Sequence, residues 1–71
     1  MKLIKVFEKE NRKAIINLID EIFEVEFVES GSTAGIIEYP NKAYCYVADA
    51  AENWCTGVLT RETLNQYKRA A

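Results

Sequence analysis

Carboxylates are the side chains best placed to do chemistry in this sequence, which contains no histidine. Ser-His-Asp and Cys-His nucleophile systems both require an imidazole, so neither can form. Residues 20–38 carry six acidic side chains and no Lys or Arg: Asp20, Glu21, Glu24, Glu26, Glu29 and Glu38. A pair such as Asp20 and Glu24 could act as acid and base only in a cleft that raised the pKa of one of them. We expect a solvated surface and no enzymatic activity.

The acidic segment instead favours binding. An acidic cluster on a small protein can occupy a basic groove of a larger protein by electrostatic complementarity. We expect the six carboxylates to gather near one edge of the domain, beside Tyr44 and Tyr46 on one face of a strand, where tyrosines make good protein contacts. The sequence therefore predicts a non-enzymatic inhibitor or modulator of a larger protein with a basic surface, such as a nucleic-acid-handling protein. Its size and charge are typical of the short acidic inhibitors made by phages and mobile elements, an analogy of size class only.

Two other functions stay open, besides a face that only keeps the protein soluble. Basic residues near both ends could converge on nucleic acid, although the sequence pI of about 5.1 argues against phosphate binding. These residues are Lys2, Lys5, Lys9, Arg12, Lys13, Lys68 and Arg69. The chain could also form a structural homodimer through a sheet edge or its tyrosine face.

Metal, cofactor and membrane functions find little support. Cys45 and Cys55 are the only two cysteines, too few to complete a tetrahedral zinc site, so we expect no metal and no cofactor. No apolar segment approaches the roughly 20 residues of a membrane helix, and no signal peptide is evident. We expect a cytoplasmic protein with reduced thiols, with Cys45 half-buried in a strand. Residues 31–35 read as a plain hairpin loop and not as a phosphate-binding loop.

The elements that must position these residues form one small domain over residues 1–71, without internal repeats. Ile15, Ile16, Ile19, Ile22 and Phe23 recur at helical spacing and predict a helix over residues 12–24. Apolar and β-branched residues predict strands over residues 2–8, 25–29, 36–39 and 43–48. A short helix is expected over residues 50–55 after a cap at Asp49, ended by Gly57, and another over 61–69 after Thr60.

This order predicts an α+β fold with an antiparallel sheet of three to four strands and helices packed on one face, in the order β-α-β-β-β-α(α). Trp54 is the only tryptophan, and we expect it in the core, packed against the end of the sheet.

Overall fold

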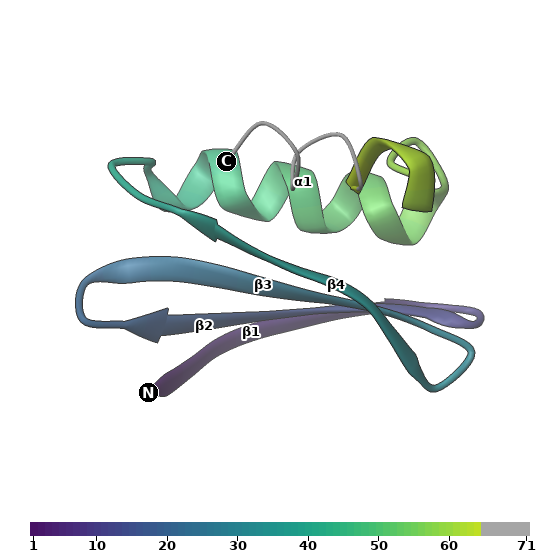
Figure 1. Cartoon of the computed structure of the whole chain (residues 1–71), viewed down its shortest axis with the longest axis horizontal. Coiled ribbons are helices and arrows are strands. Elements are labelled where there is room, and N and C mark those ends of the chain that lie inside the picture. The colour runs from purple at the N-terminus through teal and green to yellow at the C-terminus, as the bar shows by residue number, and fades with distance from the viewer. Residues whose placement is uncertain (65–71) are drawn as a thin grey trace.

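The fold is α+β: in this computed structural model a four-stranded antiparallel sheet is followed by a helix (Figure 1). The structure describes residues 1–64. The elements are β1 (Lys2–Lys9), β2 (Arg12–Ile19), β3 (Ile22–Glu29), β4 (Ser32–Tyr39) and α1 (Tyr44–Thr56). The strand order in the sheet follows the chain order, and α1 lies across one face of the sheet.

Two-residue turns join the four strands at regular spacing. Asp20 and Glu21, between β2 and β3, both have positive φ (49° and 68°), as do Ser30 and Gly31 between β3 and β4 (51° and 80°). Paired positive φ angles are those of a type I′ turn, whose twist matches that of the flanking strands. Glu10 and Asn11 make the corresponding connection between β1 and β2. An eight-residue strand and a two-residue turn thus recur every ten residues. The sequence analysis expected no internal repeat and did not predict this spacing.

The predicted helix over residues 12–24 is wrong, because this segment forms β2, a turn and the start of β3. Isoleucine is β-branched and favours strands. Ile16 and Phe23 face the core, whereas Ile15 and Ile22 lie on the opposite face of the sheet. Apolar residues on both faces of the β2–β3 hairpin therefore have the spacing expected for a helix. The predicted element order is wrong here, because a strand follows β1 where a helix was expected.

The predicted strand over residues 43–48 is also wrong, because α1 begins at Tyr44 and runs through Asp49, the expected cap. Its local sequence favours a strand, but Val47, Ala51 and Trp54 recur at helical spacing and are fully buried against the sheet. Packing of this apolar stripe outweighs the local preference of the two tyrosines. The expected helix over residues 50–55 lies within α1.

Other predicted elements are confirmed. The strands over residues 2–8, 25–29 and 36–39 lie within β1, β3 and β4. Gly57 ends α1 in the left-handed conformation (φ 89°), where a glycine has no side chain to strain. The Thr60 hydroxyl accepts a hydrogen bond from the Thr63 backbone N–H at 3.4 Å as a helical segment begins over residues 61–64. The remainder of the helix expected over residues 61–69 lies outside the described residues.

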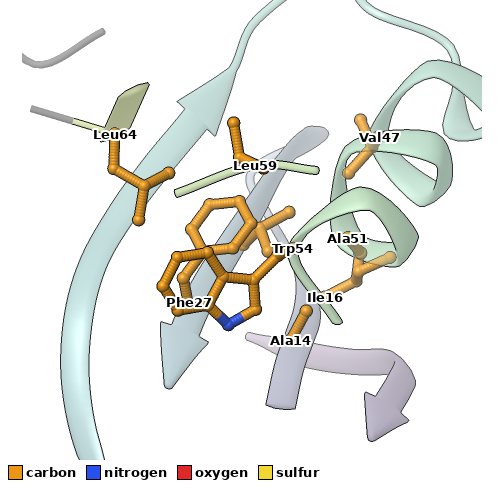
Figure 2. Packing of buried hydrophobic residues seen from close by; sticks show 9 residues of the cluster. Ala14, Ile16, Phe27, Val47, Ala51, Trp54, Leu59 and Leu64 are labelled. Atoms are coloured by element: carbon orange, nitrogen blue, oxygen red, sulfur yellow. The ribbon is translucent and has the colours of Figure 1, made fainter. Parts of the chain in front are cut away.

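The core lies between the sheet and α1 (Figure 2). Trp54 is fully buried, as predicted, with its ring edge-on to Phe27 at 5.5 Å between centroids. Its indole N–H donates to the Val28 carbonyl at 3.0 Å, which satisfies the polar atom of a buried ring. Leu59 and Leu64 complete this side of the core, so the segment after α1 also packs on the helix side of the sheet.

Arg12 fastens the sheet to the end of α1. Its guanidinium donates to the carbonyls of Trp54 and Leu59, both at 3.0 Å, and forms an ion pair with Glu29 at 3.3 Å. The same group lies over the Trp54 ring, 4.3 Å from its centroid. A residue that the sequence suggested for nucleic acid is therefore used to hold the two layers together.

Candidate functional site

The face of the sheet opposite α1 is covered by no element within residues 1–64. Side chains alternate between the faces of a strand, so residues that neighbour the core positions in each strand point to this side. The strand register arranges them in cross-strand rows. We call this surface the open face, and its main rows are Leu3–Asn17–Glu24–Glu38, Val6–Ile15–Glu26–Ile36 and Glu8–Lys13–Val28–Thr33.

Three of the six predicted acidic residues meet on the open face. Glu24 of β3 lies directly opposite Glu38 of β4, and Glu26 lies on the same side of β3 two residues further on. We call these three residues the carboxylate cluster. The Thr33 hydroxyl donates a hydrogen bond to Glu26, but no Lys or Arg within residues 1–64 forms an ion pair with any of the three. The cluster therefore presents negative charge without a counter-charge among the described residues.

Glu29 does not join the carboxylate cluster, because it faces the helix side of β3. Its carboxylate accepts a hydrogen bond from Arg61 at 2.8 Å and pairs with Arg12. The Arg61 hydrogen bond, assisted by the charges of both arginines and opposed by partial burial, lowers the pKa of Glu29 below its ordinary value. This residue stabilises the fold, which separates it from the predicted binding group.

Asp20 and Glu21 form the turn between β2 and β3, and both are exposed. They border the end of the open face where Ile19 pairs with Ile22. The structure therefore groups three of the six carboxylates, places two at the rim and removes one to the other side.

Apolar side chains surround the carboxylate cluster. Leu3 is 60% exposed and Ile36 is 49% exposed, and Val6 is also exposed on the open face. Ile15, Ile19 and the other apolar residues there are half-buried by one another. The open face is therefore mixed: its carboxylate cluster lies on β3 and β4, and its exposed apolar side chains lie on β1 and β4.

The basic residues mostly lie elsewhere. Lys13 is the one base among the three rows of the open face, and it pairs with Glu8 at 3.9 Å. Lys2, Lys5 and Lys9 belong to the rows that face the helix side. Lys68 and Arg69 lie outside the described residues.

The two predicted tyrosines are separated from the carboxylate cluster. Tyr44 and Tyr46 lie in the first turn of α1, on the other side of the sheet, because the expected strand is a helix. Tyr44 contacts the Phe23 ring (5.8 Å between centroids), and Tyr46 contacts Tyr39 (6.0 Å). Both tyrosines are partly exposed. The prediction that Tyr44 and Tyr46 lie beside the acidic residues on one surface is therefore wrong for the carboxylate cluster.

A shallow hollow of about 130 Å³ lies beside Tyr46. It is lined by Tyr39, Tyr46, Asp49, Ala50, Asn53 and Leu59. The ammonium group of Lys42 lies over the Tyr46 ring, 4.8 Å from its centroid. This hollow is not connected to the open face, since α1 and the sheet separate them.

The two cysteines lie apart in burial. Cys45 is exposed in the first turn of α1, and not half-buried in a strand as predicted, while Cys55 is partly buried and burial raises its pKa. Among the described residues no three His, Cys, Asp or Glu side chains come together as a metal site. No helix in the described part of the chain is long and apolar enough to cross a membrane.

Asn17 is a residue of this face that sequence reasoning missed. The residue is only 9% exposed, in the row between Leu3 and Glu24. It is polar and does not belong to the apolar pattern of residues 12–24, so its burial had no sequence signal. Comparison of the chain with protein-family models, with curated proteins and with solved structures found no match. The function therefore has to be argued from the geometry of the open face.

Proposed function

We propose that this chain is a non-enzymatic protein-binding module whose open face docks on a basic, partly apolar surface of a larger protein. The observation that carries the proposal is the carboxylate cluster, which lies beside exposed apolar side chains and has no ion-pair partner within residues 1–64. Complementary charge speeds association and selects the partner, while the apolar rows supply area that is removed from water.

The charge pattern favours a basic protein over the other candidates. Phosphates would be repelled by the carboxylate cluster, and two of the basic residues proposed for nucleic acid, Arg12 and Lys13, are held in ion pairs. A second copy docked face to face would bring two carboxylate clusters into one interface, where like charges are costly. A basic surface neutralises the cluster, and its apolar groups can cover Leu3 and Ile36.

An inhibitory or modulatory role follows from this chemistry if the basic surface normally binds nucleic acid. Binding of nucleic acid depends on lysines and arginines that neutralise phosphates. A carboxylate cluster that occupied such residues would compete with the phosphates directly. The proposed role is therefore that of a competitor for a basic surface on a nucleic-acid-handling protein.

The test combines capture of a partner with matched charge reversals. The face variant replaces Glu24, Glu26 and Glu38 with Lys. The control variant replaces Glu10, Glu52 and Glu62 with Lys, which gives the same change in net charge at exposed positions outside the three rows of the open face. Proteins captured from the native host by the wild type are identified by mass spectrometry, and the affinity for the purified partner is measured over a range of salt concentrations.

The proposal predicts that the control variant binds like the wild type, while the face variant loses the partner. It also predicts that the affinity falls steeply as the salt concentration rises. Retention of the partner by the face variant would overturn the proposal, and so would an affinity that does not depend on salt. Circular dichroism of both variants checks that loss of binding does not reflect loss of folding.

A further inference from the structure

The hollow beside Tyr46 lies on the helix side of the sheet, away from the open face. Four of its lining residues recur along one face of α1 at the helical spacing i, i+3, i+4 and i+7: Tyr46, Asp49, Ala50 and Asn53. Tyr39 at the end of β4 and Leu59 after α1 complete the lining. The volume of about 130 Å³ is well below the roughly 300–1,000 Å³ of a pocket for a drug-sized ligand, so the hollow suits one small group.

Two tyrosine rings contribute to the lining of this hollow. The ring planes of Tyr39 and Tyr46 are inclined at 64°, with 6.0 Å between their centroids. The face of an aromatic ring carries partial negative charge and attracts cations. This attraction is already visible within the chain, because the Lys42 ammonium group lies over the Tyr46 ring, 4.8 Å from its centroid.

Asp49 adds a full negative charge to the same hollow. It is exposed, and it forms no ion pair with a Lys or Arg within residues 1–64. Ala50 and Leu59 contribute apolar lining. A bare ammonium group is strongly hydrated and brings three N–H donors that need acceptors. A methylated ammonium group instead spreads its charge over apolar methyl groups, which is the cation that aromatic linings recognise best.

We infer that this hollow binds a methylated ammonium group, such as the trimethylammonium group of a choline-like molecule or of a trimethylated lysine. Its methyl groups contact the rings of Tyr39 and Tyr46, and the Asp49 carboxylate balances its charge. The sheet separates this site from the carboxylate cluster, so the inference does not depend on the proposed function.

The test compares choline with the alcohol in which the nitrogen of choline is replaced by carbon, a neutral molecule of the same shape. Each probe is titrated into the isotope-labelled full chain, and the tyrosine ring signals are followed by NMR at low salt. We expect saturable shifts at Tyr39 and Tyr46 with choline. The affinity for the neutral alcohol should be about two- to fivefold lower, the effect of one exposed cation–π contact.

Variants of two tyrosines separate the site from general binding to aromatic residues. Tyr46→Leu should abolish the preference for choline over the alcohol, whereas Tyr46→Phe keeps the ring and should keep the preference. Tyr44→Leu is the matched control, because Tyr44 is also exposed in the first turn of α1 but contacts Phe23 and does not line the hollow. This control should bind choline like the wild type. Backbone amide signals show whether each variant keeps the fold.

Two charge variants test the role of the neighbouring charged groups. Asp49→Asn should weaken the binding of choline and leave that of the neutral alcohol unchanged. Lys42→Met should strengthen the binding of choline, because it removes a competing cation from the Tyr46 ring. Opposite effects of these two variants would contradict the inference.

The source of the group is distinguished by a short peptide with one trimethylated lysine and the same peptide with an unmodified lysine. Tighter binding of the trimethylated peptide than of choline assigns the group to a protein, and weaker binding assigns it to a small molecule. Equal binding of the two peptides would overturn the inference, as would equal binding of choline and the alcohol or the absence of saturable shifts at Tyr39 and Tyr46. None of these results affects the proposed function, which fails only if the Lys face variant keeps its partner or if the affinity is independent of salt.

Discussion

The pair formed by Glu24 and Glu38 carries a cost in stability that can be measured. The two residues are direct cross-strand partners, and like charges in this position destabilise a sheet. Replacing Glu38 with Lys converts this repulsion into an attraction across the same pair. If the open face is kept acidic at the expense of the fold, the Glu38→Lys variant should therefore have a higher free energy of unfolding than the wild type.

The size of the effect follows from the cross-strand geometry. Opposed charge pairs on a sheet contribute roughly 0.2–1 kcal/mol, and two unit charges about 5 Å apart in water interact with a similar energy. Removal of the repulsion and gain of the attraction together give an increase of about 1 kcal/mol in the free energy of unfolding at low salt. For a domain of this size that corresponds to an increase of about 4–8 °C in Tm.

The assay is urea denaturation and thermal unfolding of the wild type and the Glu38→Lys variant at low and high salt. The Debye length falls to about 3 Å in 1 M salt, so most of the gain should disappear there. Glu52→Lys on α1 has the same charge change and should alter stability by less than about 0.5 kcal/mol. No gain at low salt, or a gain that persists at high salt, would refute the reasoning from the cross-strand pair. The same variant should bind the partner less tightly, so stability and binding should change in opposite directions.

Two further predictions concern the residues that join the layers. Arg12→Met should lower the free energy of unfolding by roughly 2–4 kcal/mol, because it removes two charged hydrogen bonds to carbonyls and the contact with the Trp54 ring. The loss is measured by denaturation followed by Trp54 fluorescence. A loss below about 0.5 kcal/mol, the range of surface substitutions, would contradict the prediction. Because the pKa of Glu29 is lowered in the folded state, chiefly by Arg61, its stabilising effect is complete above the ordinary value of 4.5 and is lost as the pH falls through the lowered pKa. Glu29→Gln should therefore be less stable than the wild type near neutral pH and should lose less stability on acidification, and parallel curves of stability against pH would show that this ion pair plays no part.

The sequence allowed the α+β class and several strands to be predicted, and the reasons for the failures are specific. Residues 25–29 alternate clearly, with Val25 and Phe27 on the buried side, and they were correctly predicted as a strand. Residues 12–24 carry apolar side chains on both faces of a hairpin, and alternation is lost when the uncovered face is also apolar. The turn at Asp20 and Glu21 lacks the Asn-Gly or Asp-Gly pair that usually signals a type I′ turn.

The candidate site was predictable in part. The acidic segment was visible because its charges are segregated along the chain. Which of its members share a face depends on strand parity: Glu24 and Glu26 are two residues apart and face the same way, whereas Glu29 is an odd number of residues away and faces the core side. The placement of Tyr44 and Tyr46 was missed because the strand preference of the tyrosines was given more weight than the helical spacing of Val47, Ala51 and Trp54 that follows them. The burial of Asn17 depends on neighbours from β1 and β3 and could not be read from β2 alone.

Side chains alternate between the two faces of the sheet along all four strands, so neighbouring residues in a strand have different surroundings. Along each strand, one set of positions holds α1 and the other set meets the surroundings. Substitutions at exposed outward positions, such as Leu3 and Ile36, should therefore disturb the fold less than substitutions on the inward set.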